Sequence, residues 1–75
     1  MIKVILKTST RREVIADEKK NILEFLEENE VGDGCQLILD GTILTQAEIH
    51  GSFENLGIKD GDSVRLSAIV KAFGA

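Results

Sequence analysis

The chain has 75 residues, of which 43% are hydrophobic and 29% are charged, and its formal net charge is −4. This composition is typical of one small globular domain, and the excess of acidic residues argues against a nucleic-acid-binding protein. No apolar run approaches the roughly 18 to 20 residues of a membrane span. Because there is one cysteine and the N-terminus lacks the apolar centre of a signal peptide, we expect a single cytoplasmic domain over residues 1–75 without a disulfide.

The first two predicted elements form a β-hairpin. Residues 2–8 alternate, with three apolar side chains on one side of the chain: Ile2, Val4 and Leu6. The other side carries Lys3, Ile5 and Lys7. Residues 11–16 alternate again, and the polar residues 8–10 between the two segments suit a turn. A period of two with β-branched residues is typical of half-buried strands.

A single amphipathic helix is predicted over residues 19–29. Asp17 precedes it as a suitable N-cap, because its carboxylate can accept hydrogen bonds from the first free backbone amides. Ile22, Phe25 and Leu26 form one apolar stripe on an otherwise charged segment. We expect the two glycines of residues 32–34 to end the helix, since glycine adopts the left-handed conformation of a helix exit.

The middle of the chain is predicted to hold two short strands. One strand covers residues 35–39 and the other residues 42–44. Asp40-Gly41 lies between them and predicts a tight turn, because both residue types tolerate positive φ. Residues 45–51 are polar and are predicted to form a loop.

The last predicted segment combines a helical turn, two corners and a strand. Phe53 and Leu56 attach one short helical turn to the core, and Gly57 provides its exit. Asp60-Gly61 then predicts a tight turn. Alternation from Val64 onward predicts a final strand over residues 63–71.

Several features in this order resemble a known family over nearly the whole chain. They are the first hairpin, the single helix, the L-I-L-D-G segment at residues 37–41, and the pattern Phe53-x-x-Leu56-x-Ile58 before Val64-x-Leu66. The family is the ubiquitin-like β-grasp family. The resemblance implies an α+β fold in which a mixed sheet of four to five strands, in the order 2-1-5-3, packs on one α-helix. It also implies a 3-10 turn before the last strand. Residues 12–17 and 23–29 further resemble small ubiquitin-like proteins in mobile genetic elements of Gram-positive bacteria, a likeness that implies no known activity.

Two features of the sequence depart from the family pattern. Ubiquitin and its sulfur-carrier relatives act through a C-terminal Gly-Gly that an activating enzyme adenylates, whereas this sequence reads Lys71-Ala-Phe-Gly-Ala75 at its end. The positions that match ubiquitin's apolar recognition patch are Ser9, Ile38 and Ser67, of which one is apolar. We therefore expect neither conjugation through this end nor recognition by ordinary ubiquitin-binding proteins.

No set of residues predicts catalysis or metal binding. Cys35 has no cation close to it in sequence, and a reactive thiol requires such a neighbour or a helix N-terminus. His50 is the single histidine, and one histidine does not make a metal site without partners. We expect no enzyme activity, no cofactor and no metal.

Charge is distributed unevenly along the chain. Residues 1–12 carry four cations and no acid, while residues 17–33 are strongly acidic. If the helix covers one face of the sheet, the opposite face gathers a candidate protein-interaction surface, with Ile15 or Ile69 beside it. Its predicted residues are Lys3, Ile5, Lys7, Ile38, Arg65 and Ser67. Clustered exposed apolar side chains of this kind mark contacts.

Three functions are compatible with these residues. The favoured one is a non-catalytic ubiquitin-like interaction module or accessory subunit, a monomer that binds a protein partner but neither nucleic acid nor a membrane interior. The sequence does not identify this partner. The second is a ubiquitin-type modifier or sulfur carrier whose C-terminus is exposed by processing. The third is a small cysteine enzyme that acts through Cys35.

Overall fold

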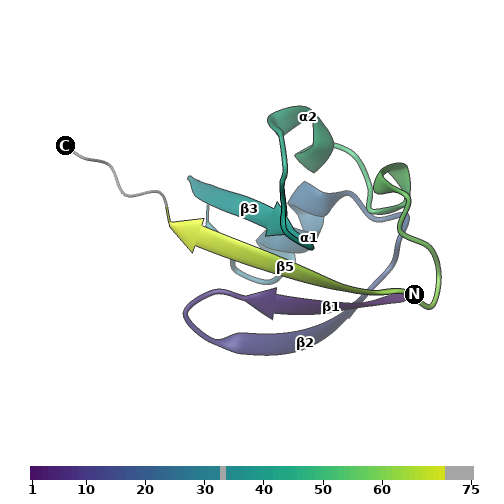
Figure 1. The fold of residues 1–75 in the computed structure, drawn as a ribbon, viewed down its shortest axis with the longest axis horizontal. Coiled ribbons are helices and arrows are strands. Elements are labelled where there is room, and N and C mark those ends of the chain that lie inside the picture. Colours follow the sequence, from purple (N-terminus) through teal and green to yellow (C-terminus); the bar gives the residue numbers. More distant parts are fainter. Residues whose placement is uncertain (33, 71–75) are drawn as a thin grey trace.

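A computed structural model describes residues 1–32 and 34–70. The strands are β1 (Ile2–Lys7), β2 (Arg11–Ala16), β3 (Cys35–Leu39), β4 (Thr42–Ile43) and β5 (Ser63–Val70). The helices are α1 (Ile22–Glu28), the short α2 (Gln46–Ile49) and a 3-10 turn, Glu54–Leu56 (Figure 1). The five strands form one sheet in the order β2-β1-β5-β3-β4. The central pair, β1 and β5, is parallel, and the other pairs are antiparallel. This is the predicted β-grasp architecture.

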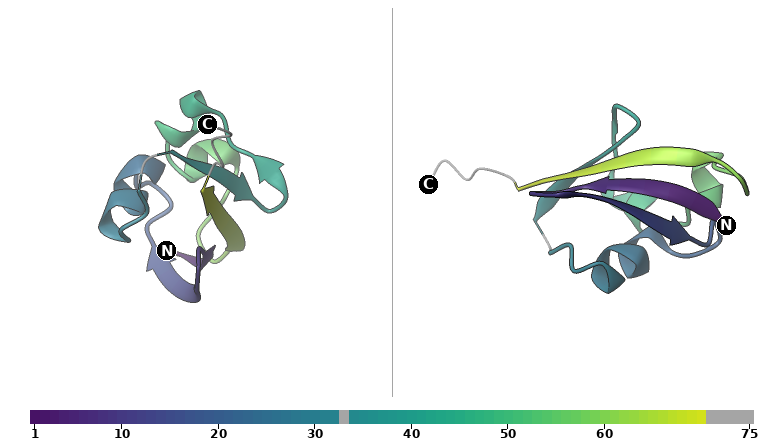
Figure 2. Two further views of the ribbon diagram at one scale, coloured as in Figure 1. Left: turned by 90° about the vertical axis from the view of Figure 1, so that its left-hand side faces the viewer. Right: turned by 90° about the horizontal axis from the view of Figure 1, so that it is seen from below.

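The helix and the sheet form two layers with the core between them. Figure 2 shows α1 against one face of the sheet, while the β3–β4 hairpin projects on the opposite side. The predicted alternation of β1 is confirmed, since Ile2, Val4 and Leu6 are almost fully buried. Phe25 of α1 meets Phe53 edge to face, with ring centroids 5.4 Å apart. Such aromatic contacts add about 0.5–1.5 kcal/mol to the burial of the rings themselves.

Helix α1 is shorter than predicted and has a different cap. Asn21, not Asp17, is its N-cap: the Asn21 side chain accepts hydrogen bonds from the amides of Leu23 and Glu24. Asp17 instead accepts from the amide of Lys19 at 2.9 Å and stabilises a turn. Contacts with the segment that precedes Phe53 decide this boundary. The amide of Ile22 donates to the carbonyl of Gly51 at 2.9 Å, and Asn21 also bonds the backbone of His50.

The predicted glycine exit from this helix is also wrong. The helix ends at Glu28, with Asn29 as its C-cap. Glu30 then adopts the left-handed conformation, with φ of 60°. The Asn29 side chain donates to the carbonyl of Phe25 at 2.8 Å, and this carbonyl also accepts from the Asn29 amide. Residue 33, the middle of the predicted exit, lies outside the described residues.

The segment predicted as a polar loop contains a second helix. Thr45 and Glu48 form a capping box around α2: the Thr45 hydroxyl accepts from the Glu48 amide, and the Glu48 carboxylate accepts from the Thr45 amide. The spacing T-x-x-E is a local signal for a helix start, so the sequence contained the information. Ile49 is buried and ties this single turn to the core.

Residues 52–66 fold as predicted. Phe53 has no exposed surface, and Leu56 is half-buried against the core. Gly57 closes the 3-10 turn with φ of 85°, and Gly61 forms the next corner with φ of 91°. The turn before β5 is held to the start of β1, because the amide of Gly61 donates to the carbonyl of Met1 at 2.9 Å.

Candidate protein-interaction face

The outer face is the face of the sheet opposite α1. Because side chains alternate along a strand, burial of the apolar set in β1 turns the intervening residues outward. Cross-strand pairing then collects the outward residues of all five strands. They are Lys3, Ile5, Lys7, Arg11, Glu13, Ile15, Gln36, Ile38, Ile43, Ser63, Arg65, Ser67 and Ile69.

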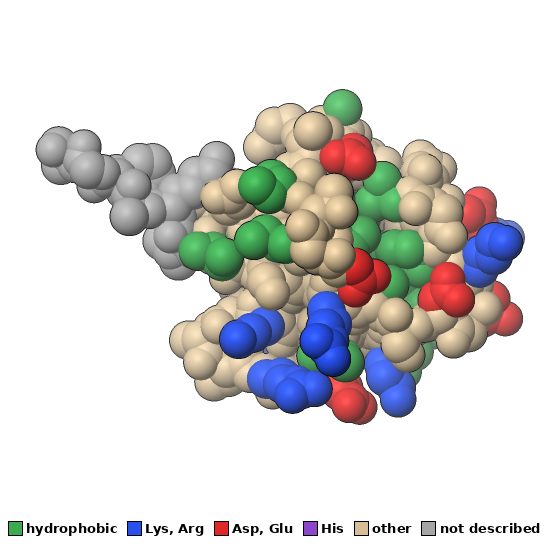
Figure 3. All heavy atoms as spheres, viewed as in Figure 1, with side chains coloured by type: hydrophobic (Ala, Val, Ile, Leu, Met, Phe, Trp, Pro, Cys, Tyr) green, Lys and Arg blue, Asp and Glu red, His purple; other side chains and the backbone are tan. Residues whose placement is uncertain are grey.

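One row of this face crosses the whole sheet. Register places Lys7 between Arg11 and Ser67, and Ile38 between Ser67 and Ile43. From β2 to β4 the row therefore reads cation, cation, hydroxyl, aliphatic, aliphatic. Figure 3 shows the same division, with Lys and Arg side chains over β1 and β2 and hydrophobic side chains toward β3. The outer face is thus polarised from one sheet edge to the other.

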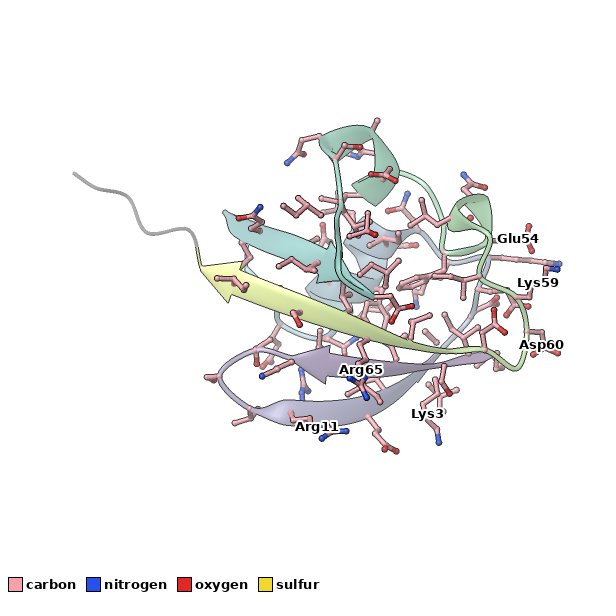
Figure 4. The ribbon with its side chains drawn as sticks, in the orientation of Figure 1. Lys3, Arg11, Glu54, Lys59, Asp60 and Arg65 are labelled. Carbon is pink, nitrogen blue, oxygen red and sulfur yellow. The ribbon has the colours of Figure 1, made fainter. Side chains whose placement is uncertain are left out.

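The basic half of the face contains a hollow of about 190 Å³. Three cations, a hydroxyl and the half-buried Ile5 line it: the residues are Ile5, Lys7, Arg11, Arg65 and Ser67. We call this the cationic hollow. Arg11 comes from β2 and Arg65 from β5, and both lie on the side of the sheet that faces the viewer in Figure 4. Among the described residues, no carboxylate forms an ion pair with any of the three cations.

The aliphatic half of the face is a patch of three isoleucines. Ile43 and Ile69 are 57% and 50% exposed, and Ile38 is half-buried between their strands. A second, wider hollow of about 550 Å³ adjoins this isoleucine patch, and its lining residues are Ile38, Asp40, Gly41, Arg65 and Ser67. Two residues, Arg65 and Ser67, line both hollows. The two hollows are therefore neighbours on one surface.

Acidic groups are few on the outer face. Glu13 lies opposite Ile5 on the edge strand β2. Asp40 stands at the rim, where its Oδ1 accepts from the backbone amide of Arg65 at 2.9 Å. The helix layer behind the sheet carries the exposed carboxylates Glu24 and Glu27. The asymmetry predicted from the sequence is present: the molecule is acidic on the helix side and basic on the β1–β2 half of the outer face.

The structure brings all six predicted face residues to one side of the sheet. Lys3, Lys7 and Arg65 are exposed, and Ile5, Ile38 and Ser67 are half-buried. Ile15 and Ile69, the two residues predicted as alternatives beside this face, also point outward. Ile15 is paired with the outward residue Lys3, and Ile69 with Gln36. Ser9, which matches the remaining position of ubiquitin's recognition patch, lies in the bend between β1 and β2.

Among the outer-face residues that the sequence did not predict, two belong to the cationic hollow or the isoleucine patch. Arg11 lines the cationic hollow, and Ile43 is paired with Ile38 from the edge strand β4. The alternation of residues 11–16 places Arg11 on one side of its strand. Which face of the sheet that side joins depends on the turn at residues 8–10, and this turn lacks residues that specify a turn type. Ile43 belongs to a strand of two residues, which is too short to show a period.

An ion cluster forms at the opposite end of β1 from the cationic hollow. The Met1 ammonium lies 2.6 Å from an Asp60 oxygen and 2.8 Å from a Glu18 oxygen. The hydrogen bonds to Asp60 and then to Glu18 raise the pKa of this ammonium from 8.0 to about 10. The same contact with the ammonium lowers the pKa of Asp60. The cluster joins the first strand to the turn before β5 and to the segment before α1.

Among the described residues, neither Cys35 nor His50 lies in an arrangement typical of a reactive or metal-binding site. Cys35 is half-buried at the start of β3, and Arg12, which shares a hollow with it, donates instead to the carbonyl of Asn29 at 2.9 Å. His50 is exposed at the end of α2. Within residues 1–32 and 34–70, no group of three or more His, Cys, Asp and Glu side chains could hold a metal ion. In this same part of the chain, no helix has the length and apolarity to cross a membrane.

Two sequence predictions concern residues beyond the described part of the chain. They are the end of the last strand at Lys71 and the Gly74-Ala75 terminus that bears on conjugation. Comparison with models of known protein families and with curated proteins finds no match for this sequence.

Proposed function

We propose that this protein is a non-catalytic ubiquitin-like interaction module, or accessory subunit, that binds a protein partner through the outer face of its sheet. One observation carries the proposal: the isoleucine patch (Ile38, Ile43 and Ile69) is exposed beside the cationic hollow on an uncovered sheet face. Exposed large hydrophobic residues that are contiguous and bordered by polar groups are typical of protein contacts. The β-grasp order of elements supports the ubiquitin-like resemblance.

The distribution of apolar residues strengthens this assignment. Fifteen of the described residues form the buried core, and they lie between the sheet and the helices. Ile43 and Ile69 contribute nothing to that core, although each is a β-branched residue that would serve it. Full burial of such a side chain provides roughly 1.5–3 kcal/mol, and leaving each of these two about half exposed forgoes about half of it. Contact with a partner recovers this free energy.

The kind of side chains that meet on this face supports the proposal of a non-catalytic role. The cationic hollow holds three cations, one hydroxyl and an aliphatic floor. General acid–base or nucleophilic chemistry requires a nucleophile or base whose partner lies within hydrogen-bond reach. Ser67 has no histidine or carboxylate hydrogen-bonded to it among the described residues. These side chains suit recognition. We also propose a cytoplasmic location, because one cysteine cannot form an internal disulfide of the kind that secreted domains often contain.

The test is comparative affinity capture with three immobilised forms of the protein. The wild type is compared with a variant that carries Ile43→Asp and Ile69→Asp, and with the matched control Ala47→Asp on the exposed side of α2. We expect proteins captured by the wild type and by Ala47→Asp to be lost with the double variant. Circular dichroism establishes that all three forms are folded. If the double variant captures the same proteins as the wild type, the outer face is not the binding surface.

A further inference from the structure

We infer that the partner is an acidic, amphipathic protein segment whose carboxylate side chain occupies the cationic hollow while an aliphatic side chain contacts the isoleucine patch. This inference rests on the proposed function and names the chemistry of the partner. Its basis is charge complementarity: three cations from three strands surround one hollow and have no carboxylate partner among residues 1–32 and 34–70.

The chemistry of the hollow selects an anionic group on a short apolar stem. Arg11 and Arg65 carry planar guanidinium groups that can bind a carboxylate through two parallel hydrogen bonds. Lys7 adds a point charge and Ser67 a hydroxyl, while Ile5 provides an apolar floor for the methylene groups of the stem. Bringing an anion here also relieves the repulsion between three like charges. A glutamate side chain combines these properties.

The second hollow determines which side chain of the partner segment accompanies that glutamate. It shares Arg65 and Ser67 with the cationic hollow and continues onto Ile38. Strands β1 and β3 are separated by β5, so side chains on these two strands are about 10 Å apart at the usual strand spacing of about 4.8 Å. Seven residues of an α-helix rise about 10.5 Å. A helix that crosses the strands can therefore place a glutamate and a leucine, seven residues apart, into the two hollows.

A nucleic acid fits this face poorly. Phe25 and Phe53 are buried, so no aromatic side chain of the described residues is exposed to stack on a base. Asp40 and Glu13 would face the phosphates, and the chain as a whole carries a net charge of −4. Long-range repulsion would slow the approach of a polyanion, whereas a short segment can place one carboxylate in the cationic hollow and an aliphatic side chain, not a charge, beside Ile38 and Asp40.

The test uses a synthetic helical peptide of 18 residues with one leucine stripe and glutamates along its flank. A matched peptide has glutamine in place of each glutamate. Binding is followed by amide chemical shifts on the labelled 75-residue protein. We expect the glutamate peptide to bind about tenfold more tightly, the difference that one charge-assisted contact provides. We also expect this affinity to fall as salt is added, and the shifts to centre on residues 5, 7, 38, 65 and 67.

Variants of the protein locate the contact. Arg65→Gln and Arg11→Gln should each weaken binding of the glutamate peptide by about fivefold or more, as loss of a charged hydrogen bond would. The matched controls Lys19→Gln and Lys59→Gln remove the same charge from exposed positions elsewhere and should leave the affinity unchanged. Equal effects of Arg65→Gln and Lys59→Gln would show that only the overall charge matters and would overturn the inference.

Two further outcomes separate this inference from the proposed function. If both peptides bind equally and Ile43→Asp weakens both, the outer face binds partners through apolar contact alone, and only the inference fails. If neither peptide responds to any outer-face variant and capture is also unchanged, both proposals fail. A DNA duplex of 18 base pairs that binds more tightly than the glutamate peptide at the same salt concentration would also overturn the inference.

Discussion

Individual residues show how the start of β1 is held to two other segments of the chain. Met1 is exposed, yet its ammonium group joins Asp60 and Glu18, which come from two other segments. Asp60 also belongs to the corner that begins at Lys59, where the Lys59 amide donates to Asp62 at 2.9 Å. The ammonium charge of Met1 therefore stabilises the turn that leads into β5.

The Met1 cluster predicts a pH dependence of stability with a definite sign. The folded-state pKa of the ammonium is about 10 and its ordinary value is 8.0, so its contribution is complete below about pH 8 and lost as pH rises toward 10. The pKa of Asp60 is lowered, so its contribution is lost again in acid. The melting temperature of the wild type should exceed that of Asp60→Asn at neutral pH, and the gap should shrink above pH 10.

The control for this experiment is Asp62→Asn, which removes a neighbouring carboxylate that has no ion pair with Met1 in the structure. Its difference from the wild type should not shrink between neutral pH and pH 10 in the same way. An Asp60→Asn gap that stays constant across this range would contradict a role for the ammonium. Because the groups are exposed to solvent, the effect should also decrease with added salt.

At the scale of elements, α1 is placed by its contacts rather than by its own sequence. Its apolar stripe is as predicted, with Ile22, Phe25 and Leu26 buried. Its start is set by Asn21, which caps the helix and bridges to Ser52 on the segment before the 3-10 turn. Asp17 is an equally good capping residue by type, but it lies four residues too early for this contact.

The cap assignment predicts different costs for two similar substitutions. Asn21→Ala should lower the free energy of unfolding by about 1 kcal/mol or more, because the helix loses its cap and the bond to His50 is lost as well. Asp17→Ala should cost no more than about 0.5 kcal/mol, as expected for an exposed turn residue. Urea unfolding of both variants measures the difference. Equal costs, or a larger cost for Asp17→Ala, would show that the helix begins earlier.

At the scale of the whole molecule, the polarised outer face also limits self-association. A symmetric dimer through this face would place the same surface on both sides of the contact. A two-fold axis close to the cationic hollow would bring its cations toward their own copies, without carboxylates on the face in sufficient number to offset them. Face-to-face pairing of two chains is therefore opposed by like charge, although the isoleucine patch alone would favour it.

Like-charge repulsion on the outer face predicts a monomer at low salt and micromolar protein concentration. Sedimentation equilibrium should give the mass of one chain for the wild type. Replacing both Arg11 and Arg65 by Gln removes part of the repulsion and leaves the isoleucine patch intact, so this variant should associate more strongly. A wild-type dimer that dissociates when salt is added would contradict the argument and would point to contact between the basic face and the acidic helix side of another copy.

How much of the fold was predictable depended on how local each signal is. The alternation of residues 2–8, the Asp40-Gly41 turn and the stripe of α1 are properties of neighbours in the chain, and all three are confirmed. Asp40 and Gly41 both have positive φ, as this pair of residue types predicts. The capping box of α2 was equally local and was overlooked in a segment of polar residues.

The sequence alone thus determined which residues of each strand share a side, because that follows from a period of two. The tertiary structure decided which of these sides meet. Lys7 and Ser67 are sixty positions apart and become neighbours only through the parallel pairing of β1 with β5. Ile43 joins Ile38 only because β4 turns back at the sheet edge. The cationic hollow and the isoleucine patch consist of such cross-strand neighbours, and their arrangement follows from register, which no single segment of the chain specifies.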